Sequence, residues 1–157
     1  MPQGLISPSN AILYAGEPEI QEMEVKTATN LAPGRLVIQD TNAWDVKVAG
    51  DGALLVLGVA DVMANKKLTA MQTEIATGVP LTTYSAGDQV RVLRGDIVVK
   101  LLAKSGSTIA VGTRVMAAAN GMIKQFSGTA ADALIGYSLE APTLTALCKW
   151  VLVKLTI

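Results

Sequence analysis

The strongest constraint on the fold is a repeat inside the chain. Residues 31–58 align without a gap on residues 109–136, 78 positions later, and seven of the 28 aligned residues are identical. This number exceeds what even an Ala- and Gly-rich composition predicts by chance. The identical pairs are Ala32/Ala110, Gly34/Gly112, Val37/Val115, Asn42/Asn120, Gly50/Gly128, Ala53/Ala131 and Gly58/Gly136. We infer that one unit was duplicated and that the chain folds as two related halves.

Each copy of the repeat opens with the pattern Ala-x-Gly-x-x-Val. Glycine adopts the positive φ that a tight turn requires, and the Val three positions later is then the first inward residue of the next strand. The same spacing relates Gly87 to Val90. Asn120-Gly121 favours a two-residue type I′ hairpin turn, which needs positive φ at both positions. The glycines that we expect to set the backbone in turns or at close contacts are Gly34, Gly87, Gly112, Gly121 and Gly136.

From Val25 onward, short apolar runs alternate with turn residues, which is typical of an all-β domain. We therefore expect a mostly β fold, a small pseudo-symmetric β-barrel or sandwich with at most one short helix. It would form a single domain over residues 25–157, with related halves at about 25–92 and 105–157.

Three segments carry more specific expectations. Trp44, Val46 and Val48 alternate along the chain and should share one face of a strand. The nearly continuous apolar run of residues 53–62 predicts a strand, interrupted at Gly58 by a bulge or a close backbone contact. Residues 65–77 have apolar side chains at three- and four-residue spacing, so this is the one segment that we expect to be helical.

The first 24 residues differ from the rest of the chain. Three prolines disfavour a helix or a central strand there. Two interpretations stay open: an edge segment packed on its own domain, or an arm that packs on another chain. We take residues 1–24 as an extended N-terminal arm. Its expected contacts are the large apolar residues Leu5, Ile6, Ile12, Leu13 and Tyr14.

Four acidic residues also lie in this segment. Glu17, Glu19, Glu22 and Glu24 give it a net negative charge, because no Lys or Arg precedes Lys26. A solvated face is the simpler interpretation of these carboxylates. The alternative is that they pair with a basic surface on a partner.

The charge balance of the whole chain argues against nucleic acid as a partner. Lys plus Arg equals Asp plus Glu, at 13 each, and the sequence has no basic cluster. A DNA-binding protein needs concentrated positive charge to displace the counterions of the phosphates. No wholly apolar run is longer than that of residues 53–57, which is far shorter than the ~20 residues that a membrane helix needs. We therefore expect neither nucleic acid nor a membrane as a partner.

The sequence carries no catalytic or metal-binding signature. It has no histidine, the commonest general base and a common metal ligand. Its single cysteine, Cys148, lies in an apolar run and is expected to be a buried, inert thiol. Arg94-Gly95-Asp96 is expected to be a plain turn. The aspartates expected to cap turn amides rather than bind calcium are Asp40, Asp45, Asp51 and Asp61. We expect no enzyme activity, no cofactor and no metal.

Three stretches together resemble a known family. They are "IAVGTRVMAAANGMIKQF" (109–126), "ALIGYSLEA" (133–141) and the alternating "KWVLVKL" (149–155). In this order they are similar to the capsid cement, or decoration, proteins of tailed double-stranded DNA phages. The matching elements of the first half are "LVLGVADV" (55–62) and "SAGDQVRV" (85–92). The resemblance covers about residues 25–157 and departs in residues 1–24 and at Lys66-Lys67, which looks like an insertion.

The resemblance implies a role as well as a fold. Proteins of this type are β-barrel-like and often trimeric, and they bind the outside of a capsid shell and reinforce it. The implied partners are the major capsid protein of the same virion and other copies of the chain. The implied location is the outer capsid surface, after synthesis in the host cytoplasm. Extended N-terminal arms that reach neighbouring subunits occur in such proteins, which fits the proposed arm by analogy.

Two other classes of protein stay open at this point. One is a β-barrel component of a phage tail or of another assembly, without contact to the capsid. The other is a hydrolase or a carbohydrate-binding module.

Overall fold

The computed structural model describes residues 12–27, 30–61, 76–128, 130–142 and 147–157. Its strands are short, as the spacing of turn residues in the sequence predicts. In chain order the elements are β1 (Leu13–Ala15), β2 (Glu19–Val25), β3 (Leu36–Gln39), β4 (Asp45–Val48), β5 (Gly58–Ala60), β6 (Gln89–Arg94), β7 (Val98–Ala103), β8 (Arg114–Ala117), η2 (Ala119–Gly121), β9 (Ile123–Gln125), η3 (Ala131–Ala133), β10 (Gly136–Ser138) and β11 (Lys149–Leu155), where η marks a single 3₁₀ turn.

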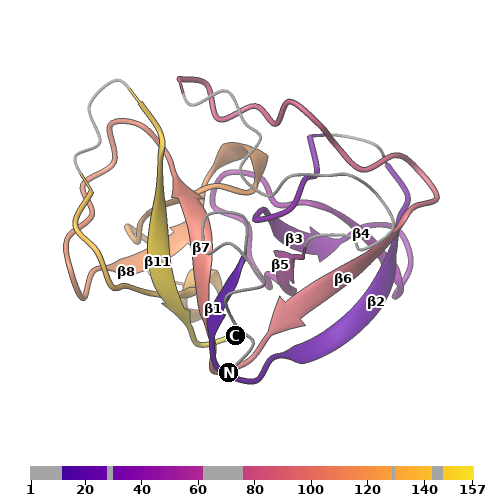
Figure 1. Cartoon of the computed structure of the whole chain (residues 1–157), viewed down its shortest axis with the longest axis horizontal. Coiled ribbons are helices and arrows are strands. Elements are labelled where there is room, and N and C mark those ends of the chain that lie inside the picture. The colour runs from indigo at the N-terminus through magenta and orange to yellow at the C-terminus, as the bar shows by residue number, and fades with distance from the viewer. Residues whose placement is uncertain (1–11, 28–29, 62–75, 129, 143–146) are drawn as a thin grey trace, which may run out of the picture.

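The strands form two five-stranded barrels with the same topology (Figure 1). The first barrel closes in the order β2-β4-β3-β5-β6, and the second in the order β7-β9-β8-β10-β11. In both, the first and third strands along the chain are parallel and every other pair is antiparallel. β1 pairs with Val98 and Val99 at the start of β7, away from the end of β7 that pairs with β9, and is an edge strand. The expected mostly β, pseudo-symmetric fold is confirmed.

The offset of 78 residues found in the sequence holds in the structure. It places β3 on β8 and β5 on β10 residue for residue. It also relates individual hydrogen bonds: the Gly34 N–H donates to the Ala60 carbonyl at 2.8 Å, and the Gly112 N–H donates to the Ser138 carbonyl at 2.8 Å. The repeat is therefore a repeat of backbone geometry.

The two barrels share one core. The interior of the first holds Met23, Val37 and Val92. The interior of the second is continuous with apolar side chains from the outside of the first barrel, namely Leu36, Val59 and Leu93. Backbone hydrogen bonds also join the barrels, for example from the Gly121 N–H to the Ala49 carbonyl at 2.8 Å. Because the apolar surface at this junction is buried, the two barrels form one unit.

The structure corrects the predicted arm from Ile12 onward. Ile12 is 1% exposed and packs in the shared core, and Leu13–Ala15 pairs with β7. Glu19–Val25 is a full strand of the first barrel and pairs along its length with β6. Pro18 precedes this strand, where its missing N–H removes no ladder hydrogen bond. Residues 12–24 therefore belong to the folded domain, as the first of the two interpretations has it, and residues 1–11 lie outside the described residues.

Two further expectations are wrong, for local reasons. Trp44 does not share the buried face of Val46: it precedes β4 and is 63% exposed. The strand expected over 53–62 is limited to Gly58–Ala60, because Leu55 has a φ of 54° and lies with Leu54 on the surface. The helix expected at 65–77 lies outside the described residues, except for Ala76 and Thr77, which are in a turn.

Candidate functional site

The turn glycines are where the repeat places them. Gly34 and Gly112 have φ values of 82° and 83°, and Gly87 has 89°. Each is the third residue of a turn closed by a hydrogen bond, such as that from the Thr113 N–H to the Ala110 carbonyl at 3.0 Å. Gly121 has a φ of 69° next to Asn120 at 57°, which is the pair of positive values that a type I′ turn needs. These residues shape the backbone and offer no side chain for binding.

The apolar residues expected to bind a partner are divided by the structure. Ile12 is buried in its own chain, and Leu13 is half-buried beside β7. Tyr14 is 59% exposed on the edge strand β1. Leu5 and Ile6 lie outside the described residues. Among the described members of the set, Tyr14 is therefore the one that presents most of its side chain to a partner.

A row of side chains on the outside of the second barrel was missed from the sequence. Arg114, Tyr137 and Lys154 lie side by side on β8, β10 and β11, since Tyr137 is in register with both of the others. The strand alternation points all three outward, because Val115 and Val153 are in the core. Tyr137 is 38% exposed. We call Arg114, Tyr137 and Lys154 the basic row.

The first barrel has an equivalent row, but its side chains are buried. The residues that occupy the same positions are Leu36, Val59 and Leu93, which share the same register. All three are buried against the second barrel. The signal was present in the repeat, since apolar Leu36 and Val59 align with Arg114 and Tyr137. A position that is apolar in one copy and cationic or amphipathic in the other marks a face that only one copy buries.

Apolar side chains extend the basic row. Leu139 follows β10 and is exposed, and its N–H donates to the Leu152 carbonyl at 2.8 Å. Leu152 is half-buried on the same outer face of β11. Val111 lies in the neighbouring turn and is also exposed. The resulting surface combines aromatic and aliphatic side chains with cations, the composition that protein interfaces favour.

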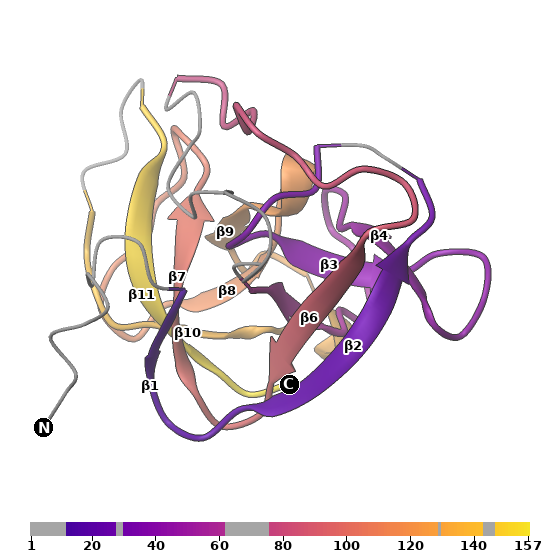
Figure 2. The same ribbon diagram turned by 45° about the vertical axis from the view of Figure 1, so that its right-hand side comes forward.

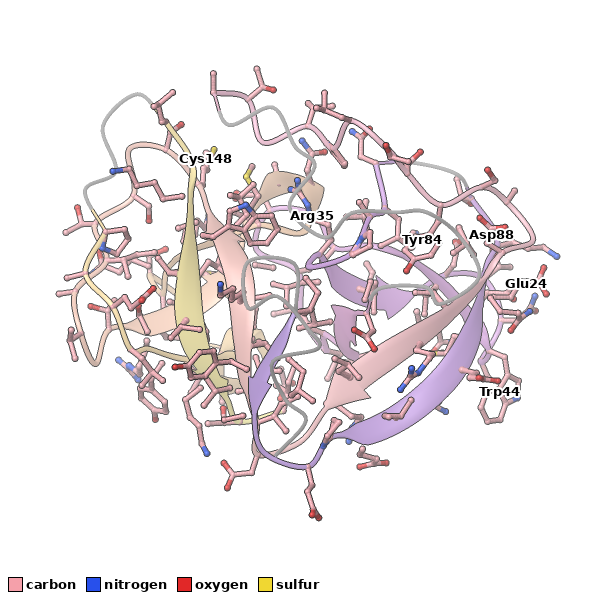
Figure 3. The ribbon with its side chains drawn as sticks, viewed as in Figure 1. Glu24, Arg35, Trp44, Tyr84, Asp88 and Cys148 are labelled. Atoms are coloured by element: carbon pink, nitrogen blue, oxygen red, sulfur yellow. The ribbon has the colours of Figure 1, made fainter. Side chains whose placement is uncertain are left out.

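An acidic surface lies on the first barrel. Met23 and Val25 point into that barrel, so Ile20, Glu22 and Glu24 line the outer face of β2. Glu24 also donates its backbone N–H to the Trp44 carbonyl at 2.9 Å, and both residues lie at the right-hand edge of the molecule in Figure 3. We call Ile20, Glu22, Glu24 and Trp44 the acidic face.

A shallow cleft of about 320 Å³ lies at the junction of the two barrels. Leu55 and Val56 line it from the first barrel, and residues near the C-terminus and η3 line it from the second. The Leu55 N–H donates to the Asp132 carbonyl across it at 3.2 Å. Most of its lining residues have aliphatic side chains, and Asp132 and Thr156 are the polar ones. The cleft therefore lacks the convergent polar groups of a small-molecule site.

Two large polar side chains are buried in the fold. Arg35 is 1% exposed, and its Nη1 donates to the Asn120 carbonyl at 3.2 Å. Burial lowers the pKa of Arg35 to about 10, while nearby Cys148 acts in the opposite direction. Burial also raises the pKa of Tyr84, with Asp61 and Asp88 adding to the shift, and its hydroxyl donates to the Asp61 carbonyl. Figure 3 shows Arg35 and Tyr84 inside the molecule, away from Glu24 and Trp44 at its edge.

Within the described ranges, the structure shows neither a cluster of metal ligands nor a membrane-spanning helix. No three His, Cys, Asp or Glu residues there come together as metal ligands. No helix among those residues is long and apolar enough to cross a membrane. The surfaces that remain as candidate sites are those that suit contact with another macromolecule: the basic row with its apolar neighbours, and the acidic face.

Comparisons with known proteins agree with this picture. The chain is similar in structure to the base of a phage head fibre, described as "The crystal structure of head fiber gp8.5 N base in bacteriophage phi29". The TM-score is 0.52 at 13% sequence identity, over 89% of this chain and 95% of that chain, so the likeness is one of fold. No curated protein matches the sequence. The family model of the XM1 gp53 minor capsid protein matches residues 2–145. The chain thus belongs to the XM1 gp53 minor capsid protein family, a family of phage capsid-associated structural proteins.

Proposed function

We propose that the chain is a decoration subunit that binds the outer surface of a phage capsid through the major capsid protein and stabilises the shell. The observation that carries the proposal is the family match, which begins at residue 2 and so includes the apolar N-terminal segment. The likeness to a head-fibre base supports a place on the head exterior. The role is mechanical, and we expect no catalytic activity.

Residues 1–11 are the proposed arm in this account. Its apolar residues Leu5 and Ile6 precede Ile12, which is fixed in the core, and β1, which is an edge strand. The arm is thus tethered at the periphery of the second barrel. Burying two such side chains on a neighbouring subunit stabilises the contact by roughly 3–6 kcal/mol before the cost of ordering the arm. Repeated over a symmetric shell, even a small net gain for each subunit resists internal pressure.

We also propose that the subunit acts as a homotrimer. An assembly of three linked subunits can bind the shell at several sites at once and so gains avidity. Three linked arms raise the effective concentration of each for its site on the shell. Native mass spectrometry of the purified protein measures this state directly, and a monomer at micromolar concentration contradicts it.

Co-sedimentation with empty, expanded shells tests the proposed binding. The full chain is expected to pellet with the shells and to raise the temperature at which they rupture. Protein that stays in the supernatant while the shells pellet contradicts the proposal. Binding to isolated tails but not to shells identifies a tail component instead. Binding to a glycan array through exposed Trp44 identifies a carbohydrate-binding module.

The arm is tested by deleting residues 2–11. We expect this variant to keep the thermal unfolding curve of the full chain and to bind shells more weakly. Leu5→Ala with Ile6→Ala is the finer variant, and Ser7→Ala with Ser9→Ala is its matched control in the same segment. If the deletion leaves shell binding unchanged, the arm does not contact the shell. If it unfolds the domain, the segment belongs to the core.

A further inference from the structure

The two barrels carry opposite charge although the whole chain is neutral. Residues 1–97 contain seven Lys or Arg and eleven Asp or Glu, a net charge of −4. Residues 98–157 contain six Lys or Arg and two Asp or Glu, a net charge of +4. The division falls between β6 and β7, where one barrel ends and the next begins. The molecule is therefore an electric dipole along the line that joins its two barrels.

The strands that bear the two candidate surfaces belong to different barrels. β2, which bears the acidic face, and β11, which bears part of the basic row, are on opposite sides of the molecule in both views (Figures 1 and 2). Each surface also has exposed apolar side chains. Ile20 and Trp44 flank the glutamates of the acidic face, and Tyr137 lies between Arg114 and Lys154 in the basic row, with Leu139 nearby. Charged and apolar side chains side by side are typical of a protein interface.

The repeat indicates that the outer row of a barrel is suited to packing on another barrel. In the first barrel, Leu36, Val59 and Leu93 occupy this row and pack against the second barrel of the same chain. In the second barrel, the same row is on the surface. A third barrel can therefore pack there, and the cations of the row favour an acidic one.

We propose that copies of this chain associate head to tail, with the basic row of one copy on the acidic face of the next. This proposal deepens the self-association proposed above and does not depend on binding to the shell. Each copy contributes two different surfaces, so the contact is heterologous, and repeated rotation closes it into a ring. Arg114 and Lys154 face Glu22 and Glu24 across the contact, and Tyr137 and Leu139 pack near Ile20.

The intrachain contacts of these charges are compatible with the proposal. Lys154 forms an ion pair with Asp96 at 2.9 Å, but the Asp96 side chain is 86% exposed, so the pair is at the surface. Arg114 stacks on the Phe126 ring at 5.0 Å, which leaves the edge of its guanidinium to donate to a carboxylate. Glu22 is opposite Arg91 on β6, so the acidic face is partly balanced within its own barrel. Exposed pairs of this kind contribute little to stability and exchange readily for an interface.

Charge reversal at each surface gives the test. Arg114→Glu with Lys154→Glu reverses the basic row, and Glu22→Lys with Glu24→Lys reverses the acidic face. Each double variant is expected to raise the dissociation constant of the oligomer at least roughly tenfold, measured by sedimentation equilibrium at low salt. The fourfold variant, in which both surfaces are reversed on the same chain, is expected to regain the oligomer. Lys104→Glu with Lys149→Glu, at the far end of β7 and β11, changes the net charge equally and should leave the oligomer intact.

A mixture of the two double variants tests the polarity of the contact. Each fails to bind itself, but the reversed row of one complements the reversed face of the other. The mixture should therefore form one-to-one complexes of the two chains by native mass spectrometry. It should not form the closed ring of three, because one contact of such a ring would join two like chains. A mixture that closes into trimers as stable as those of the wild type contradicts the head-to-tail arrangement.

Other outcomes overturn the proposal outright. A wild-type chain that is monomeric overturns it, while shell binding stands on its own assay. If reversal of the basic row abolishes shell binding and leaves the native mass unchanged, the row contacts the shell instead. If reversal unfolds the chain, Arg114→Gln with Lys154→Gln makes the same comparison, and an unchanged dissociation constant for that folded pair rejects the contact.

Discussion

Gly58 and Gly136 occupy equivalent positions in the two barrels, each pressed against the backbone of the last strand. A Cβ at Gly58 would lie 2.3 Å from the Leu93 carbonyl oxygen, and a Cβ at Gly136 would lie 2.0 Å from that of Lys154. Real Cβ atoms do not approach backbone oxygen so closely, so both strands can pair only where the side chain is absent. The repeat has kept the residue that permits closure of each barrel.

Gly136→Ala is accordingly expected to destabilise the protein by roughly 3 kcal/mol, at the upper end of the cost of overpacking. The strand must move away from β11, because the obstacle is backbone rather than a flexible side chain. Gly50→Ala is the control, since nothing lies within 4 Å of its Cβ position and its φ is not positive. It should change the free energy of unfolding by less than about 0.5 kcal/mol. Equal effects of the two substitutions in urea denaturation contradict this account.

Ile12 and Tyr14 separate a core role from a surface role in the N-terminal segment. Ile12→Ala removes a fully buried side chain and is expected to cost about 2–4 kcal/mol of unfolding free energy, because it leaves a cavity. Tyr14→Ala removes a mostly exposed side chain and should cost less than about 1 kcal/mol. Thermal unfolding of both variants measures the two losses of stability. If Ile12→Ala leaves the stability unchanged, Ile12 contacts a partner rather than the core.

The sequence predicts the mostly β fold and its two related halves better than it predicts the surfaces. Turns at Gly34 and Gly112 follow from local chemistry, which one copy of the repeat is enough to reveal. Which outer row is covered depends instead on how the barrels pack, and that is a contact between segments far apart in the chain. The identity of Tyr137 does not say whether a partner lies above it, so the basic row needed the structure.

The predictions for Trp44, Leu55 and Ile12 are wrong for the same reason. Trp44 has the spacing of a buried residue but lies one position before the strand starts, and its side chain is mostly exposed. Leu55 belongs to an apolar run, yet its positive φ turns the chain out of the strand. Ile12 lies in a proline-containing segment and is buried beside Gly34, whose missing Cβ leaves room for the side chains of Ile12 and Trp150. Alternation alone cannot locate the end of a strand or a contact between distant segments.

Tyr84 makes stability fall at alkaline pH. Its pKa is raised in the folded state, so its stabilising effect is complete below the ordinary value of 10 and is lost as the pH rises above it. Tyr84→Phe removes the hydrogen bond to the Asp61 carbonyl and should cost about 1 kcal/mol at neutral pH. At pH 11 the wild-type advantage should fall by about 1.4 kcal/mol, and so disappear. Urea denaturation of both proteins at pH 7 and 11 measures the difference, and an advantage independent of pH contradicts it.

Arg35 is a buried cation at the junction of the barrels, where its Nη1 reaches the Asn120 carbonyl. Burial disfavours its charged form, as the pKa of about 10 indicates, so an apolar chain of similar length avoids that cost. Arg35→Met should therefore be neutral or stabilising at pH 7, within about 1 kcal/mol, although the Asn120 carbonyl loses a donor.

Arg35→Ala removes the same charge and also the packed stem, so we expect a loss of about 2–4 kcal/mol from the cavity. The sign of the pH dependence provides a second check. Because the folded-state pKa of Arg35 is lowered, protonation favours the unfolded chain, and the wild type should gain stability relative to Arg35→Met as the pH rises above 10. If Arg35→Met is as unstable as Arg35→Ala, the guanidinium hydrogen bond outweighs its burial, and the cation itself holds the two barrels together.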